Sequence, residues 1–297
     1  MNLSLGFRRS VLPVFTPLLS AGLFFLLHAS PAAAEKIEKH FTVKGRPVVM
    51  IQNVADGRIE VKSWKNSEIV VSAAGSSNKI GLEMEQADDR IEVTARILDT
   101  GAQPSDLTEN IQLTVPEETE LQIKTQSGLI YVEQVLGDMN LVTVAGDVHL
   151  KEVSGYIIVH TTGGSLICTQ CAGKLDFSSI SGGAQILQPS LRSVNLTTTT
   201  GNILFDGDFI RNGIYSMRSG RGLVEVRFAG TDSFDLNAQT STGNVDNRAE
   251  AFLKPDSHGI RHTASRYAKG LFGSVGSGLA KVELSSFSGT IRILKRD

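Results

Sequence analysis

From Leu121 onward, apolar and polar residues alternate in short runs that recur along the chain. Apolar residues occupy every second position of a run, which is the period of a β-strand with one buried face, and the 3.6-residue period of a helix is absent. A glycine stands between the two runs of each unit, and the first five intervals between these glycines are 18 or 19 residues. The glycines are Gly128, Gly146, Gly164, Gly182, Gly201, Gly220, Gly243 and Gly289.

Residues at equal distance from these glycines belong to the same chemical class. The positions five before, two after and four after are mostly apolar, as Leu141, Val148 and Leu150 are around Gly146. The residue three before is Thr or Ser in all units except one, and the residue directly before is always small. We expect these hydroxyls to point inward at a corner and to bond to one another and to the backbone. We expect each glycine to let the backbone take the corner.

A unit of this length holds two short strands and two turns, which is too little to bury its own apolar face. Such units become stable by stacking like columns on one another. The sequence therefore predicts an all-β fold, a parallel β-solenoid of about eight 18–19-residue rungs with an irregular N-terminal β-cap. An antiparallel sandwich is the alternative, but its successive strands would not need the same residue class at the same offset.

The repeat divides the chain into regions. Residues 35–120 alternate without the glycine pattern, although residues 54–61 resemble one degenerate rung. We predict that this region is a β-cap on the β-solenoid repeat region, residues 121–297, and a separately folded small β-domain is the alternative. Residues 248–280 interrupt the repeat and are predicted to be a loop excursion or a degenerate rung. The charged end, Lys295 to Asp297, is expected to protect an open sheet edge.

The first 34 residues have the pattern of a secretory signal peptide. Arg8 and Arg9 precede an apolar run, residues 11–27, and three alanines end at Ala34 before a charged segment. An uncleaved membrane anchor is the alternative reading of this run. We expect an exported protein, periplasmic or extracellular and at the cell surface, with no integral membrane segment after cleavage.

Composition and charge narrow the class of partner. With 41 % hydrophobic and 20 % charged residues, the chain can bury a core. Removing Arg8 and Arg9 with the leader takes the formal charge from −2 to −4. Such a mild acidic balance offers no electrostatic footprint for nucleic acid.

These residues resemble a bacterial family of β-strand-repeat proteins of unknown function that are catalogued as candidate adhesins and are related to the head domains of proposed autotransporter adhesins. The resemblance rests on the leader, the entry segment at residues 113–121 and repeated units such as residues 125–132. The resemblance implies a stacked β-repeat architecture and export. No catalytic residues come with this family. Adhesion is the function that the resemblance suggests, as a hypothesis.

One motif, Cys168 and Cys171, has the C-x-x-C spacing of redox and zinc sites. Both cysteines fall in apolar columns, so we interpret them as core residues, with a local disulfide as the first alternative and a metal or redox function as the second. The histidines His40, His149, His160, His258 and His262 share no column and are interpreted as solvated. We predict no metal site, no cofactor and no catalytic residue.

The outward positions decide between an enzyme and a binding protein. Solenoid polysaccharide enzymes place acids on one outward face across neighbouring rungs, but the residues directly after the glycines give no such pair. Outward apolar residues could instead mark a partner surface. They are Tyr131, Ile158, Ile167, Ile180, Leu204 and Leu223. We expect an adhesin-like protein with a protein or glycan partner in the envelope, on a cell surface or in the matrix. A periplasmic structural or envelope-stress-related binding protein is the alternative, and a polysaccharide-active β-helix enzyme ranks third.

Overall fold

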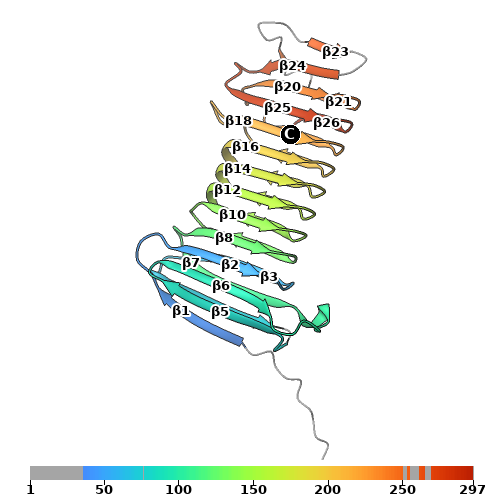
Figure 1. Ribbon diagram of the computed structural model, residues 1–297. Coiled ribbons are helices and arrows are strands. Elements are labelled where there is room, and N and C mark those ends of the chain that lie inside the picture. The colour runs from blue at the N-terminus through green and yellow to red at the C-terminus, as the bar shows by residue number, and fades with distance from the viewer. Residues whose placement is uncertain (1–35, 76, 250–252, 255–260, 265–268, 297) are drawn as a thin grey trace, which may run out of the picture. The chain divides into compact units, whose positions relative to one another are not determined.

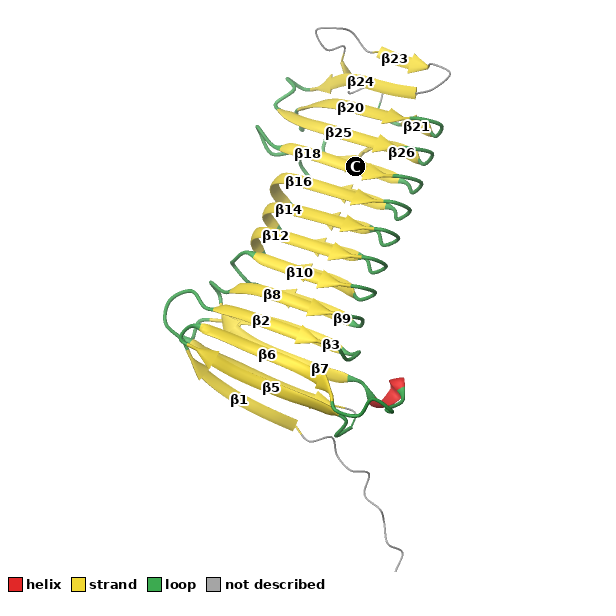
Figure 2. Cartoon of the chain, viewed as in Figure 1, coloured by secondary structure: helices red, strands yellow, loops and turns green. Residues whose placement is uncertain are grey.

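The computed structural model describes residues 36–296 except 76, 250–252, 255–260 and 265–268 (Figure 1). Residues 34–297 cluster into one compact unit. The predicted signal peptide, residues 1–34, and His258 lie outside the described residues. The described part is almost entirely β-structure, with one short 3-10 helix at Pro104–Asp106 (Figure 2). The all-β prediction is confirmed.

The described strands form two sheets, here called sheet A and sheet B. In spatial order, sheet A contains β1 (Lys36–Thr42), β4 (Glu68–Gly75), β7 (Glu109–Pro116), β3 (Arg58–Trp64), β9 (Leu129–Glu133), β11 (Asp147–Lys151), β13 (Leu166–Thr169), β15 (Ala184–Leu187), β17 (Ile203–Asp206), β19 (Val224–Phe228), β26 (Thr290–Lys295) and β21 (Asn244–Asn247).

Sheet B faces sheet A across the core. It contains β22 (Leu253–Lys254), β24 (Lys269–Val275), β20 (Phe234–Thr240), β25 (Ala280–Ser286), β18 (Ile214–Ser219), β16 (Ser190–Thr198), β14 (Ala172–Ser179), β12 (Ser154–Thr161), β10 (Met139–Thr143), β8 (Glu120–Thr125), β2 (Val48–Asn53), β6 (Arg90–Ile97) and β5 (Ile80–Ala87), while β23 (Arg261–Ala264) also pairs with β24.

The repeat units stack as the sequence predicts. We call one strand of sheet B and the next strand of sheet A together a coil, such as β10 with β11. Residues one repeat apart are direct partners, since Met139 pairs with both Leu121 and Ile157. From β8 to β19 these pairings are parallel, for example β10 with β12 and β11 with β13. The result is a solenoid-like repeat with two long sheets.

The core lies between the two sheets and is built from the predicted apolar columns. Inward residues such as Ile123, Leu141, Val148 and Leu166 are fully buried, and they belong to one continuous cluster. Burying an aliphatic side chain of this size contributes about 1.5–3 kcal/mol. Because each column continues into the next coil, no coil could bury these side chains alone.

Corner hydroxyls bond to the backbone in the coils from β8–β9 onward. The hydroxyl of Thr198 accepts the N–H of Gly201 at 3.1 Å and donates to the carbonyl of Gly182 in the preceding coil at 2.9 Å. The same bond to the glycine three residues later occurs at Thr143, Thr161, Ser179, Ser219, Thr240 and Ser286. The hydroxyl column therefore closes the turn, and in part also ties one coil to its neighbour.

The corner glycines are required for a different reason from the one predicted. A Cβ on Gly164 would lie 1.8 Å from the carbonyl oxygen of Gly146, and one on Gly182 would lie 1.7 Å from that of Gly164. Of the predicted glycines, Gly128 alone has a positive φ. Close approach of the neighbouring coil, and not backbone dihedral freedom, therefore excludes a side chain at most of these corners.

Gly220 is not the repeat glycine of its coil, so that prediction was wrong by two residues. The residue equivalent to Gly201 is Gly222, since Ser219 pairs with Thr198 and Val224 with Ile203. The physical reason is the longer connection between β17 and β18, which brings Phe209 into the core. Its ring stacks on Phe205 with centroids 5.1 Å apart.

Both ends of the repeat depart from the order of the chain. The degenerate rung predicted around residues 54–61 is β2 with β3, and it lies between β6–β7 and β8–β9, parallel to both neighbours. At the other end, β25 with β26 lies between β18–β19 and β20–β21. The last strand therefore has partners on both sides and is no edge strand, which corrects the expectation for the charged end.

The predicted loop excursion at residues 248–280 contains strands. β24 pairs antiparallel with β20 over seven residues, from Phe234 with Val275 to Thr240 with Lys269. Within the predicted excursion, Leu271 and Val275 of β24 are buried. At the other end of the repeat, antiparallel pairing joins β1 to β4 and β5 to β6. At each end of sheet B, an antiparallel strand thus covers the outermost strand of the parallel stack: β5 covers β6, and β24 covers β20.

Candidate functional surface on sheet A

The outward side chains of sheet A form a continuous column along the coils. Direct pairing places them in one register, because outward positions of parallel strands stack on one another. In order, they are Glu60, Tyr131, His149, Ile167, Gln185, Leu204, Glu225, Arg292 and Asp246. Charge is concentrated toward the two ends of this column.

At the N-terminal end, the charges form a network of ion pairs. Lys62 Nζ lies 2.6 Å from Glu60, Arg58 Nε lies 3.0 Å from the same carboxylate, and Lys151 Nζ lies 2.7 Å from Glu133. The pKa of Glu60 is lowered, chiefly by its hydrogen bond to Lys62. Arg58 also lies over the ring of Tyr131, 5.0 Å from the centroid. The carboxylates and cations of this end are therefore largely occupied by each other.

At the C-terminal end, arginines alternate with carboxylates. Arg292 contacts Glu225 at 3.1 Å and Asp246 at 3.0 Å, and Arg227 contacts Glu225 at 2.6 Å. Arg227 also approaches Asp206 at 3.6 Å. Hydrogen bonds from the arginines, first Arg248 and then Arg292, lower the pKa of Asp246.

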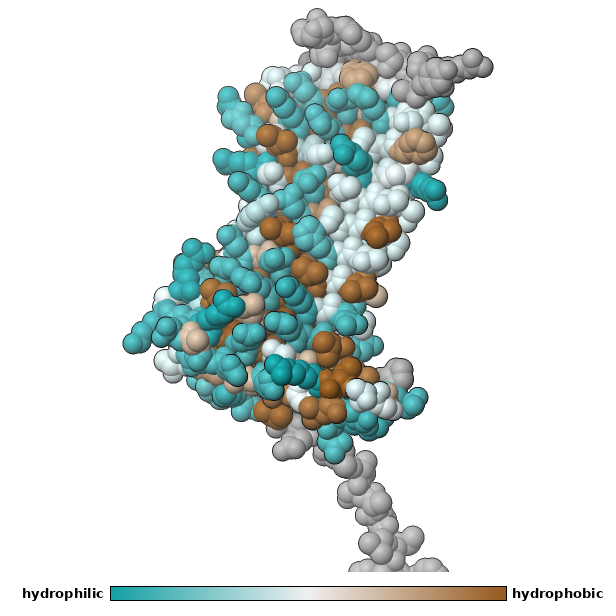
Figure 3. All heavy atoms as spheres, viewed as in Figure 1, coloured by the Kyte–Doolittle hydropathy of each residue, from teal (hydrophilic) through white to brown (hydrophobic). Residues whose placement is uncertain are grey.

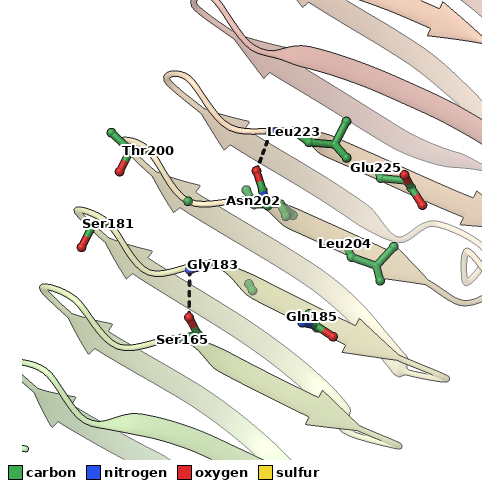
Figure 4. Close-up of a pocket in the computed structure, with 12 residues that line it drawn as sticks. Ser165, Ser181, Gly183, Gln185, Thr200, Asn202, Leu204, Leu223 and Glu225 are labelled. Carbon is green, nitrogen blue, oxygen red and sulfur yellow. Dashed lines mark hydrogen bonds between the residues drawn. The ribbon is translucent and has the colours of Figure 1, made fainter.

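Between the two networks, half-buried aliphatic side chains lie among exposed uncharged polar ones, and Glu225 of the C-terminal network borders this stretch. Ile167, Leu187, Leu204 and Leu223 are half-buried there. A shallow depression of about 510 Å³ lies in this stretch (Figure 4). It is lined by Ser165, Ser181, Gly183, Ala184, Gln185, Thr200, Gly201, Asn202, Ile203, Leu204, Leu223 and Glu225. We call this region the central stretch.

Gly183 accounts for the hollow. In the neighbouring coils, the residue directly after the corner glycine offers a side-chain oxygen to the backbone of the next coil. Ser165 accepts the N–H of Gly183 at 3.3 Å, and Asn202 accepts the N–H of Leu223 at 2.8 Å (Figure 4). Gly183 has no side chain to offer to the N–H of Asn202. The column of side chains is interrupted there, and a polar floor is left open beside Leu204.

The outward apolar residues predicted from the sequence divide between several surfaces. Tyr131, Ile167 and Leu204 lie on the outer face of sheet A, with Leu223 directly before β19. Ile158 lies in β12 of sheet B, and Ile180 lies in the turn after β14, where it is 58 % exposed. Over the coils in Figure 3, apolar side chains are scattered among hydrophilic ones. Three of the six predicted residues, Ile167, Leu204 and Leu223, lie in the central stretch.

Carboxylates of adjacent coils do converge on sheet A, at positions other than those directly after the glycines. Asp206 and Glu225 both contact Arg227. The prediction considered only the residue directly after each glycine, whereas these carboxylates lie further along β17 and β19. The outward alternation of those strands could have revealed them. Both carboxylates are paired with guanidinium groups, Asp206 with Arg227 and Arg296 and Glu225 with Arg227 and Arg292.

The two cysteines lie in the core columns and are bonded to each other. Cys168 pairs with Leu150 and Ile186, and both cysteines are fully buried. The structure joins them in a disulfide with an S–S distance of 2.00 Å. The bond closes the turn around Gln170, whose φ is +55°. The two cysteines therefore occupy core positions, as interpreted from the sequence, and also form the local disulfide that was the first alternative.

The histidines do not come together in the described structure. His149 lies on sheet A and His160 on sheet B, where its Nδ1 is 2.6 Å from the hydroxyl of Ser178. His40 in β1 has a raised pKa, because its side chain hydrogen-bonds to Glu68 and then to Glu38. His262 lies in β23. Among the described residues, no group of three or more His, Cys, Asp or Glu is placed to hold a metal ion.

The chain belongs to the Toastrack DUF4097 family, whose model matches residues 49–294. This confirms the resemblance to a β-repeat family of unknown function. No curated protein matches the chain. In the described part of the chain, no helix has the length and apolar character needed to cross a bilayer.

Solved structures similar to the chain share little of its sequence. A candidate adhesin from Bacteroides fragilis is 14 % identical, with a TM-score of 0.48 over 88 % of this chain and 97 % of its own. A candidate cell adhesion protein from Clostridium sporogenes is 10 % identical, with a TM-score of 0.29 over 89 % and 100 %. A candidate lipid-binding protein from Parabacteroides distasonis is 12 % identical, with a TM-score of 0.41 over 88 % and 97 %. Likenesses this distant carry no functional conclusion.

Proposed function

We propose that this chain is a non-enzymatic, exported β-repeat protein that presents the outer face of sheet A to a partner, in the manner of an adhesin. The partner lies in the envelope, on a cell surface or in the surrounding matrix. The proposal includes a parallel β-solenoid of about eight rungs with a β-cap at residues 35–120. The parallel pairing of the coils supports it.

The central stretch is the observation that carries this function. Half-buried aliphatic side chains with a shallow hollow between them are typical of a surface that a partner covers. Most of the charge lies in the ion-pair networks at the two ends, and Glu225, which lines the hollow, is already paired with Arg227 and Arg292. The polar floor around Gly183 and Asn202 adds hydrogen-bonding groups for orientation.

A matched pair of substitutions tests the proposal. Leu204→Lys places a charge in the central stretch, whereas Ile158→Lys places one on sheet B, and both side chains are half-buried and outward. Fluorescent mature protein is titrated onto intact cells, purified cell wall and outer membrane of the source bacterium. We expect saturable binding that Leu204→Lys weakens at least about tenfold and Ile158→Lys leaves unchanged. Equal binding by both variants, or no saturable binding to any fraction, would contradict the proposal.

Localisation is tested separately. Protease treatment of intact cells is compared with treatment after osmotic shock. Degradation on intact cells supports the adhesin-like role, whereas protection until shock supports the alternative of a periplasmic structural or envelope-stress-related binding protein.

A further inference from the structure

The last coil of the chain is held as an insert between two coils that precede it. We call β25 with β26 the C-terminal coil, and the space between β18–β19 and β20–β21 its slot. The C-terminal coil pairs in parallel with both walls of the slot, through β18 and β20 in sheet B and through β19 and β21 in sheet A. It is therefore bound on both sides by segments that are remote in sequence.

The inward residues of sheet A are alike in the three coils. The three coils present equivalent apolar residues to the core, Val224, Ile291 and Val245, which are direct partners. Each coil also has the same corner hydroxyl bond, from Ser219, Ser286 and Thr240. These sheet A residues and corner bonds therefore do not distinguish the observed order from the order of the chain, in which β20–β21 would lie directly on β18–β19.

The outward charges do distinguish the two orders. In the observed order, Arg292 separates Glu225 from Asp246 and contacts both, at 3.1 and 3.0 Å. In chain order, Glu225 and Asp246 would occupy neighbouring positions of one column, and like charges placed directly opposite are destabilising. Glu225 is only 6 % exposed, so its repulsion by a second carboxylate would be weakly screened. The slot is thus selective for a coil that carries a cation at this position.

The covalent tether between the cap strand and the C-terminal coil is short. Residues 276–279 alone connect β24 to β25, and Gly276, Ser277 and Leu279 are exposed. From these contacts we infer that the slot is a binding site for a coil with an outward arginine, and that the C-terminal coil of a second copy of this chain can occupy it. The exchanged coil keeps the strand pairings of residues 280–295 with the slot, while the turn at residues 276–279 changes its path and gives up its hydrogen bonds to Ser233. Exchange of an identical element is a low-cost route to linked copies.

A cut in the tether makes the binding measurable. A recognition site for a sequence-specific protease is inserted between Ser277 and Gly278 of the full chain, and the folded protein is cleaved. A fluorescent synthetic peptide of residues 280–296 is then added in excess. We expect the peptide to displace the cleaved coil and to remain bound through size-exclusion chromatography.

Two altered peptides test the basis of recognition. Arg292→Glu should bind at least about tenfold more weakly, since it places three carboxylates in one column. Lys281→Glu makes the same charge change on the same coil, at an exposed residue for which no ion pair is found among the described residues, and should bind like the original. Equal binding of both altered peptides, or failure of the original peptide to enter the cleaved protein, would overturn the inference.

Exchange between intact chains is the second readout. Two populations of the uncut protein with different fluorophores are partly unfolded together at high concentration and refolded. We expect mixed dimers that contain both fluorophores, and fewer of them when both populations carry Arg292→Glu. Monomers alone would show that the slot accepts only the coil of its own chain.

Discussion

Arg292 Nη1 lies 3.1 Å from Glu225 Oε2, although the two residues are 67 positions apart in the chain. The same guanidinium reaches Asp246 through its Nε at 3.0 Å. A planar guanidinium can serve two carboxylates at once, which a single ammonium group does poorly. This contact joins three coils on the outer face of sheet A.

A double-mutant cycle on this pair should show a favourable coupling. Glu225→Gln and Arg292→Gln are made singly and together, and the free energy of unfolding is measured in urea. Because the Glu225 side chain is only 8 % exposed and that of Arg292 is 31 % exposed, we expect a coupling of about 1–2 kcal/mol. Arg292→Lys should recover less than half of the loss. Additive single effects would show that the pair contributes nothing specific.

The corner hydroxyl of Thr198 should contribute more to the free energy of unfolding than the hydroxyl of Thr197 on the same strand. Thr198→Val keeps the shape but leaves the N–H of Gly201 and the carbonyl of Gly182 without this partner, at a cost of about 1–3 kcal/mol. Thr197 lies outward on the same strand, and Thr197→Val should change the free energy of unfolding by less than about 0.5 kcal/mol. Thermal and urea unfolding of both variants measure the difference, and equal losses would contradict this role.

Two adjacent glycines should respond differently to the same substitution. Gly164→Ala would place its Cβ 1.8 Å from the carbonyl oxygen of Gly146, so the coils must separate locally. A Cβ on Gly163 meets its nearest atoms at an ordinary 3.7 Å. We expect Gly164→Ala to cost at least about 2 kcal/mol or to prevent folding, and Gly163→Ala to change stability by less than about 1 kcal/mol. Urea midpoints, with soluble yield as a second measure, decide this, and equal responses would argue against close approach as the reason for the glycine.

The coil could be predicted from the sequence because stacking imposes the same requirement on every unit. Inward aliphatic residues such as Leu141, corner hydroxyls such as Thr198 and corner glycines such as Gly164 each occupy a site that neighbouring coils also create. The error at Gly220 arose where the chain leaves this regularity to place Phe209 in the core. A spacing rule contains no signal for such a connection.

The order of the coils and the candidate surface were only partly predictable. Ile291 and Val245 are both aliphatic, and either could lie next to Val224. The sequence pattern therefore could not show that the C-terminal coil is inserted. Ile167, Leu204 and Leu223 were recognised as outward apolar residues from alternation alone. The hollow beside them depends on the missing side chain of Gly183 within a column of polar residues, which becomes visible only once the register is known.

Asp232 should make stability depend on pH between about 4 and 6. This carboxyl is 9 % exposed, and burial, with the nearby charge of Asp208, raises its pKa to about 6. It accepts the N–H of Ala229 at 3.0 Å, and Arg296 opposes the shift only weakly. The folded state therefore keeps its proton at pH values where the unfolded chain has already lost it.

The sign of this effect follows from the raised pKa. As pH rises from about 4 to 6, the unfolded state binds fewer protons than the folded state at this group, so stability falls, and it is level above pH 6. The shift of about two units corresponds to at most about 3 kcal/mol. Asp232→Asn cannot ionise, so the stability of the variant relative to the original protein should improve across this window by up to that amount. The difference below pH 4 serves as the baseline, because it contains only the changed hydrogen bonds. Urea unfolding at half-unit intervals from pH 3.5 to 7.5 measures it, and a difference that stays constant with pH would show that Asp232 titrates alike in the folded and unfolded chain.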